Sequence, residues 1–269
     1  MSGNRLLRDA LAEERKYKIS GGIYHKLQID FAYNSNHIEG SRLTHEQTRY
    51  IYETKSVGIE PTRVNDIIEA VNHFRCFDYV LDNLSVPLSE GFIKSLHRIL
   101  KQGLFLDDAS EAIIGDYKKY PNEVGEITTV HPSQVPTKLF LLISQYNRLH
   151  DVTLYDIADF HARFELIHPF YDGNGRVGRL IMLKQCLENN IEPCIITEDL
   201  KLFYYKGLKE WQTENKKERL IDTLLLAQDD VKAALDYFEI QYDPTTLKAK
   251  ELINARKITA APDQTHRRR

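Results

Sequence analysis

The chain has 269 residues, enough to bury a core without disulfide or metal staples, and its hydrophobic content of 42% is ordinary for a globular domain. Its 36 Lys and Arg against 39 Asp and Glu give a formal net charge of −3, which argues against a nucleic-acid-binding surface. Three cysteines without a CxxC pair favour a reducing compartment, and without a signal sequence or an apolar run of about 20 residues we expect a cytoplasmic protein with no membrane partner.

Residues 1–85 are predicted to form helices separated by glycine- and proline-containing breaks. Ser35 and Glu39 are four residues apart in this stretch, so on a helix they share one face, and Gly40 is suited to end that helix. An ordinary capped surface helix is the alternative interpretation. Residues 86–195 are predicted to form the core, beginning with a helix over Glu90 to Leu100 that Ser89 caps.

The stretch from Pro121 to Pro136 is the least helical part of the centre. Its apolar residues Val124 and Ile127 lie among glycine and threonine residues, which predicts a short β-hairpin. An exposed loop is the alternative interpretation.

Two amphipathic helices are predicted on either side of a glycine-rich loop. The first extends from Asp156 to Ile167 and the second begins near Arg176, because apolar residues recur in both at intervals of three and four. These residues are Ile157, Phe160, Phe164 and Ile167 in the first, and Val177, Leu180, Leu183 and Leu187 in the second.

The loop between these helices combines the parts of a phosphate site with a proton acceptor. Its three glycines allow backbone N–H groups to converge on an anion, its arginines match phosphate oxygens, and its aspartate is a hard oxygen ligand of the kind Mg²⁺ prefers. Imidazole, with a reference pKa of about 6.5, accepts a proton readily near neutrality. Phe170 is predicted to be a buried anchor. The loop reads His168-Pro169-Phe170-Tyr171-Asp172-Gly173-Asn174-Gly175-Arg176-Val177-Gly178-Arg179.

This loop meets every fixed position of the pattern HPFx[DE]GNGRxxR, so the chain resembles the Fic (Fido) family. The resemblance implies an all-α fold, the Fic helical bundle with a short β-hairpin flap. It also implies transfer of AMP from ATP to a Ser, Thr or Tyr hydroxyl of a protein, with Mg²⁺. By the same resemblance His168 is the general base, Asp172 holds Mg²⁺, and the nucleotide phosphates contact Gly173, Asn174, Gly175, Arg176, Gly178 and Arg179.

The segment Ser35 to Gly40 fits the pattern [ST]xxxE[GN], which the family uses for self-inhibition. The resemblance is therefore to the class with an N-terminal inhibitory helix. In that class the glutamate, here Glu39, pairs with the second loop arginine, here Arg179, and denies it to the γ-phosphate. In some members the same glutamate activates water to remove AMP, and the sequence leaves both roles open.

The resemblance extends to the flap and to the segment after the loop. It places Val124, Gly125, Glu126 and Ile127 near the nucleotide, with the protein substrate presented along the flap. It also predicts that Tyr204 stacks near adenine and that Gln212 hydrogen-bonds the base, although core packing explains Tyr204 equally well.

Residues 196–243 are predicted to add helices to the same domain, and residues 244–269 to form a partly disordered extension. Auto-AMPylation and assembly into a homo-oligomer stay open. The alternatives to AMP transfer are transfer of phosphate or phosphocholine, removal of AMP, and a regulator that binds nucleotide without turnover.

Overall fold

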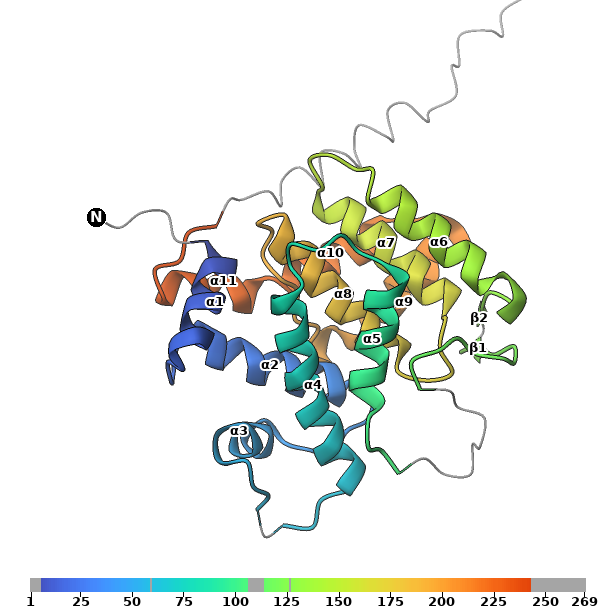
Figure 1. The fold of residues 1–269 in the computed structure, drawn as a ribbon. Helices are drawn as coiled ribbons and strands as arrows, with labels where there is room; N and C mark the ends of the chain where they lie inside the picture. The colour runs from blue at the N-terminus through green and yellow to red at the C-terminus, as the bar shows by residue number, and fades with distance from the viewer. Residues whose placement is uncertain (1–5, 59, 106–113, 126, 243–269) are drawn as a thin grey trace, which may run out of the picture.

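The computed structural model describes residues 6–58, 60–105, 114–125 and 127–242, and this part of the chain is mainly helical (Figure 1). The N-terminal helices are α1 (Leu7–Tyr17), α2 (Ile23–His37), α3 (His45–Thr54) and α4 (Val64–Asp82). The central elements are α5 (Glu90–Lys101), β1 (Glu123–Val124), β2 (Ile127–Thr128), η1 (Pro132–Gln134), α6 (Val135–Tyr146), α7 (Leu154–Ile167) and α8 (Asn174–Glu188). The C-terminal helices are α9 (Glu198–Glu214), α10 (Glu218–Leu226) and α11 (Asp229–Tyr237). The prediction of an all-α fold with a short hairpin is confirmed.

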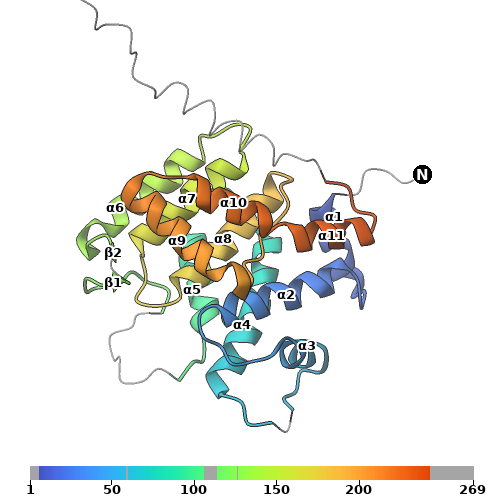
Figure 2. The ribbon, with the colours of Figure 1, turned by 180° about the vertical axis from the view of Figure 1, so that it is seen from behind.

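Helix α8 lies at the centre of the molecule. Every residue from Asn174 to Leu187 except Gly175 is buried, so this helix has no solvent face. Figure 1 shows α4 and α5 on one side of it, and Figure 2 shows α9 and α10 on the other. The elements in direct contact with α8 include α7, α5, α4 and α2, so at least four helices hold α8 in place.

The helices next to this loop begin close to the predicted residues. Ser89 caps α5 through a 3.1 Å hydrogen bond from the Phe92 amide, as expected. Helix α7 begins two residues before Asp156, because Thr153 forms a capping box with that aspartate. Helix α8 begins two residues before Arg176.

Helix α2 ends at His37, so the Ser35–Glu39 segment extends past the end of the helix instead of lying wholly within it. Gly40 has a φ of +97°, and its amide donates to the His37 carbonyl while the Ser41 amide donates to Asn36. This is the bonding of a glycine-terminated helix, as predicted for Gly40. The turn places Glu39 beyond the last helical residue, where its side chain faces the start of α8.

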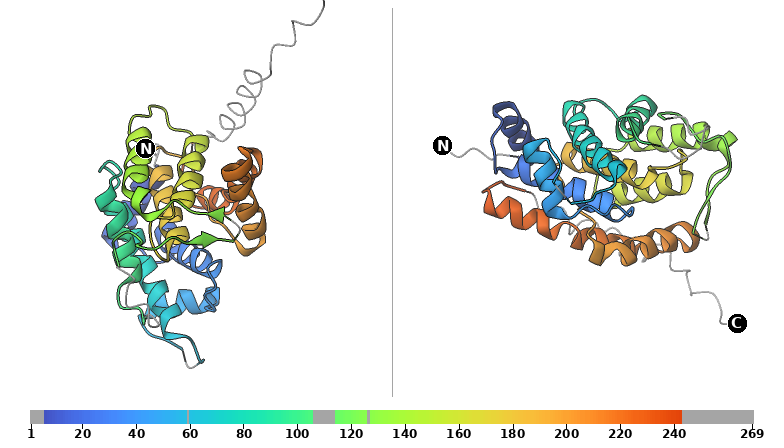
Figure 3. Two further views of the ribbon diagram at one scale, coloured as in Figure 1. Left: turned by 90° about the vertical axis from the view of Figure 1, so that its right-hand side faces the viewer. Right: turned by 90° about the horizontal axis from the view of Figure 1, so that it is seen from below.

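The predicted hairpin is present and very short. Its strands pair antiparallel, with Glu123 opposite Thr128 and Val124 opposite Ile127. Figure 3 shows the hairpin at one edge of the molecule, and the hairpin precedes α6 in the chain. Both strands are largely exposed, so the hairpin is held through its two ends and not by a core of its own.

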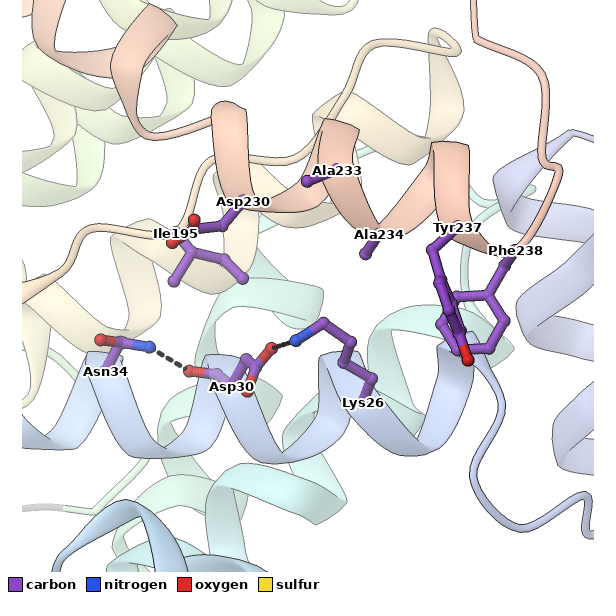
Figure 4. Close-up of a pocket in the computed structure, with 9 residues that line it drawn as sticks. All are labelled: Lys26, Asp30, Asn34, Ile195, Asp230, Ala233, Ala234, Tyr237 and Phe238. Carbon is purple, nitrogen blue, oxygen red and sulfur yellow. Dashed lines mark hydrogen bonds and ion pairs between the residues drawn. The ribbon is translucent and has the colours of Figure 1, made fainter.

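A surface groove lies between α2 and α11 (Figure 4). On its α2 side Lys26 pairs with Asp30 at 2.8 Å, and the side-chain nitrogen of Asn34 donates to the Asp30 backbone carbonyl at 2.9 Å. Ile195 and Phe238 are among its apolar lining residues. None of the predicted site residues lines this groove.

The described chain continues to Tyr242, and the predicted extension over residues 244–269 lies outside the described residues. Among the described residues, no helix combines the length and apolarity that a membrane span needs.

Candidate active site

The loop between α7 and α8 is anchored by Phe170, whose side chain is fully buried. Its ring stacks on His97 of α5 with the centroids 3.9 Å apart and the planes 2° from parallel. The Gly115 amide donates to His97 Nδ1, so the His97 Nε2 proton is directed at the Asp172 carbonyl, 3.0 Å away. Burial lowers the pKa of His97 to about 4, which keeps this ring neutral. Phe170 is therefore structural, as predicted.

The side chain of Asn174 closes the loop. Its oxygen accepts from the Phe170 amide at 2.8 Å and its nitrogen donates to the Phe170 carbonyl at 2.9 Å. Both polar atoms of the side chain are thus engaged within the protein.

Gly173 sets the direction in which α8 begins. Its φ is +81°, a conformation that favours glycine, and a Cβ there would lie 3.0 Å from Lys101 Cε. The first turn of an α-helix presents N–H groups that have no acceptor within the helix, and the helix dipole favours negative charge there. The start of α8 is therefore suited to bind an anion.

Cationic and acidic side chains surround this helix start. Asp172 forms an ion pair with Lys101, and its side chain is 66% exposed. Arg176 is buried, with Nη1 2.5 Å from Glu69 and Nη2 3.8 Å from Asp172. Burial acts to raise the pKa of Asp172, but Lys101 and Arg176 outweigh it and hold that pKa below its usual value. Neither Lys101 nor Glu69 was predicted from the sequence.

Asp172 is the carboxylate that fits a Mg²⁺ ligand. It is exposed enough to reach a bound ion, and it is ionised because two cations lie beside it. The described residues contain no group of three or more His, Cys, Asp or Glu side chains suited to hold a metal. A metal bound at Asp172 would thus take other ligands from phosphate and water, as Mg²⁺ commonly does.

Arg179 is paired with the segment Ser35–Glu39 as the resemblance implied. Its Nη2 lies 2.8 Å from Glu39 Oε1 and donates to the Ser35 carbonyl at 2.9 Å, while Nε donates to Ser35 Oγ at 3.0 Å. Burial acts to raise the pKa of Glu39, but the charge and hydrogen bond of Arg179 outweigh it, so this pKa is lowered. Glu39 is therefore an ionised carboxylate.

The Glu39 carboxylate also lies against Gly175. A Cβ added at Gly175 would collide with Glu39 Oε1, and would lie 3.1 Å from Arg179 Nη1. Glu39 thus places a negative charge at the first turn of α8, the position that suits a bound anion.

His168 directly follows α7 in a left-handed conformation, with φ of 49°, and its amide donates to the Phe164 carbonyl at 2.9 Å. Burial, followed by the charge of Lys118, lowers the pKa of His168 to about 4. The imidazole is therefore unprotonated at neutral pH, the state that a general base needs.

Gly178 has a packing function. A Cβ there would collide with Glu165 Oε1 and would lie 3.0 Å from His161 Cε1. Gly178 therefore allows close approach of α7 and α8 one turn into α8, and this position does not support the predicted phosphate contact. Burial raises the pKa of Glu165 to about 8.

Tyr204 and Gln212 are also used inside the fold. Tyr204 is 1% exposed and its hydroxyl lies 2.6 Å from His161 Nε2, so its ring is enclosed and the predicted stacking on adenine is not supported. The Gln212 side chain donates to the Ala162 carbonyl at 2.8 Å. Tyr204 is buried because it lies on the side of α9 that packs against α7. The next residue, Tyr205, is 39% exposed.

The flap residues lie at the exposed hairpin. Val124 is 44% exposed, Gly125 has a φ of +59°, and Ile127 is half-buried. Glu126 lies outside the described residues.

Four histidines with lowered pKa values make the stability of the protein sensitive to acid. Burial lowers the pKa of His73 and His161 to about 3 and that of His97 and His168 to about 4, from 6.5. As the pH falls from 6.5 towards 4.5 the unfolded chain comes to bind up to four protons at these sites that the folded chain does not, and the folded chain binds one more at Glu165. The net difference is four minus one, so stability falls with acid.

The free energy of unfolding is expected to fall by at most roughly 4 kcal/mol per pH unit, the value for a net difference of three protons. Urea unfolding at pH 7.5, 6.5 and 5.5 measures it: we expect little change between the first two values and a clear loss at pH 5.5. A free energy of unfolding that is equal or larger at pH 5.5 would contradict the neutral state of these histidines.

The fold and the loop together define a mainly helical protein whose central helix begins at a turn suited to bind an anion, with an unprotonated histidine in the same loop. Residues 87–186 match the model of the Fic/DOC family. The matched residues include α5, the hairpin, α6, α7, the glycine-rich loop and most of α8.

Curated relatives match a longer part of the chain than the family model does. "Protein adenylyltransferase Fic" of Drosophila melanogaster is 29% identical over 184 residues, covering 66% of this chain and 36% of that protein. Its counterpart in Drosophila grimshawi is 28% identical over 186 residues, covering 66% and 36%. The chain thus spans about a third of the length of these curated relatives.

Solved structures share the fold. A Fic-domain signaling protein from Bacteroides thetaiotaomicron has a TM-score of 0.64 and 25% identity, covering 93% of this chain and 96% of the other. A Fic family protein from Desulfovibrio desulfuricans has a TM-score of 0.66 and 24% identity, covering 87% and 74%.

Proposed function

We propose that this protein is a protein adenylyltransferase, which transfers AMP from ATP to a Ser, Thr or Tyr hydroxyl of a protein. The observation that supports this most is the unprotonated His168 in the same loop that leads into the start of α8, where unpaired N–H groups and the helix dipole suit an anion. The printed names of the curated relatives support the same activity.

In this proposal the hydroxyl oxygen attacks the α-phosphorus of ATP as the bond to the β-phosphate oxygen breaks. The proton of the hydroxyl passes to His168, the new P–O bond joins AMP to the protein, and pyrophosphate leaves. The N–H groups at the start of α8 stabilise the negative charge that accumulates on the phosphates, and Arg176 adds its charge beside them. Apart from this proton transfer, the protein forms and breaks no covalent bonds of its own in the reaction.

Mg²⁺ is the metal that the site residues fit, through Asp172. The ion, when bound, would neutralise phosphate charge. The side chain of Asp172 is positioned for this by the loop itself, because the Gly173 amide donates to its Oδ1 at 2.6 Å and its carbonyl is held by His97.

Glu39 holds this site inactive in our proposal. Its carboxylate contacts Arg179 and lies against Gly175, where it competes with the phosphate tail of ATP for the same positive groups. Arg179 is buried and is held by Ser35 as well, so its guanidinium is already in place for the γ-phosphate once Glu39 moves away.

The hairpin is proposed to present the protein substrate. A strand edge can pair with an extended segment of another chain, and this hairpin is exposed at the edge of the molecule. Val124, Gly125 and Ile127 then lie between the substrate backbone and the nucleotide.

The mass of the transferred group tests the proposal. The purified protein is incubated with ATP, Mg²⁺ and a mixture of cell proteins, and modified peptides are identified by mass spectrometry. We expect AMP on Ser, Thr or Tyr residues, either of the protein itself or of another protein. Phosphate adducts in place of AMP would contradict AMP transfer, and tight ATP binding without any adduct would indicate a regulator without turnover.

A further inference from the structure

The hairpin is attached at both ends to the backbone around His168. Before the hairpin, the Lys118 amide donates to the Pro169 carbonyl at 2.8 Å. After it, the Val130 amide donates to the Leu166 carbonyl at 3.1 Å. The two accepting carbonyls lie on either side of His168 in the chain, so the position of the hairpin and that of the imidazole are linked by backbone hydrogen bonds.

The side chain of Lys118 contacts the segment before the hairpin, the segment after it and the backbone next to His168. It is 4% exposed, and its Nζ donates to Asn122 Oδ1 at 2.7 Å, to Thr129 Oγ1 at 2.6 Å and to the Ile167 carbonyl at 3.5 Å. An ammonium group has three donors, and here each has an acceptor. Asn122 precedes β1 and Thr129 follows β2, so one ammonium group connects both legs of the hairpin to the residue before His168.

The two legs are also joined to each other at this level. The Thr129 hydroxyl lies 2.8 Å from the Asn122 carbonyl and 2.6 Å from its side-chain oxygen, and the Thr129 amide donates to the Asn122 carbonyl at 3.3 Å. Since the strands beyond are two residues long and largely exposed, this polar cluster of Lys118, Asn122 and Thr129 is what fixes the base of the hairpin.

We propose that Lys118 is a positioning residue that fixes the hairpin at a set distance from His168, and so aligns the hydroxyl of a protein substrate with the base. The proposal rests on the function proposed above. A substrate strand paired with the hairpin takes its position from the hairpin, and small misplacements of a reacting group lower the rate strongly. Lys118 touches neither nucleotide phosphates nor reacting atoms in this scheme, so its loss is expected to affect turnover and not ATP binding.

The charge of Lys118 provides a second link to His168. After burial, Lys118 is the largest influence that lowers the pKa of His168, while Glu39 and Asp172 act in the opposite direction. Burial lowers the pKa of Lys118 itself to about 8. Removing the ammonium group is therefore expected to raise the pKa of His168 as well as to loosen the hairpin.

Replacement of Lys118 by methionine tests the proposal, because the apolar length of the side chain is kept while the donors are lost. Lys119→Met is the matched control, because Lys119 is the next residue in the chain and its side chain is exposed. Hydrogen–deuterium exchange of residues 127–130 is measured first, with the α8 amides as a check that the variant is folded. We expect at least tenfold faster exchange at 127–130 in Lys118→Met, unchanged exchange in Lys119→Met and in α8, and recovery in Lys118→Arg.

Labelling with radioactive ATP is then measured in the Glu39→Gly background. We expect Lys118→Met to lower kcat at least tenfold with the KM for ATP changed less than threefold, and Lys118→Arg to recover most of the rate. If Lys118→Met does not fold, Thr129→Val removes one acceptor with little change of shape, and the same pattern is expected at smaller size.

The exchange measurement does not depend on activity, so it separates the two proposals. Unchanged exchange at residues 127–130 in a folded Lys118→Met variant would overturn the role of Lys118, and so would equal losses of ATP binding and turnover. Absence of labelling in the Glu39→Gly parent would instead overturn the proposed function.

Discussion

Replacing Glu39 with glycine is expected to raise protein labelling from radioactive ATP at least tenfold over the unaltered protein. Glu39 Oε1 lies 2.8 Å from Arg179 Nη2 and against Gly175, so its removal exposes a guanidinium and the first turn of α8 together. A tenfold change corresponds to about 1.4 kcal/mol. This is small compared with the energy of an ion pair whose arginine side chain is only 4% exposed.

The same substitution is expected to lower thermal stability in the absence of nucleotide. Arg179 is buried and would lose its charged partner, although the Ser35 hydroxyl and carbonyl still accept from it. ATP with Mg²⁺ is then expected to raise the melting temperature of Glu39→Gly more than that of the unaltered protein, because the phosphate tail takes the place of the carboxylate.

Two further variants distinguish inhibition from a general effect of mutation. Glu39→Gln keeps the shape and removes the charge, so we expect an intermediate gain. Glu46→Gln is the control, because Glu46 is 77% exposed on α3. Labelling that is equal in Glu39→Gly and in the unaltered protein, with ATP binding intact in both, would show that Glu39 does not inhibit.

Replacing His168 with alanine in the Glu39→Gly background is expected to lower labelling by about 10²–10⁴-fold, the usual contribution of a general base. ATP affinity, measured by calorimetry, is expected to change less than threefold, since the imidazole acts on the hydroxyl proton and not on the phosphates. His168 is neutral above its pKa of about 4, so the parent is expected to keep its activity down to mildly acidic pH until the fold is lost.

His150→Ala is the control for this substitution, because His150 is exposed and lies in the turn that precedes α7. It is expected to label at the parent rate. If His168→Ala retained more than a tenth of the parent activity, another group would have to accept the proton.

The loop and its two helices were predictable because their signals are local. Apolar periodicity located α7 and α8 to within two residues, and the aromatic character of Phe170 indicated an anchor. Capping chemistry gave Ser89, and a helix-ending glycine gave Gly40. The end of α2 at His37 was not predicted, because a helix that continues to Glu39 satisfies the same spacing.

The residues that support the loop were not predictable, because packing between distant segments brings them together. Lys101 lies on α5 and Glu69 on α4. In the sequence nothing distinguishes His97 from other histidines on the apolar face of a helix, and its role is seen only in its stacking on Phe170. Lys118 has no signal apart from its place before the hairpin. Tyr204 shows the converse limit: aromatic spacing on a helix is the same for a core residue and for a nucleotide platform, and only burial separates them.

A crystal structure of the Glu39→Gly variant with a non-hydrolysable ATP analogue and Mg²⁺ tests the central claim most directly. We expect the phosphate chain at the start of α8, the terminal phosphate on Arg179, and the His168 ring facing the hydroxyl position about 3–3.5 Å from the α-phosphorus. Nucleotide bound elsewhere, or an α-phosphorus turned away from His168 while Arg179 is free, would contradict the account.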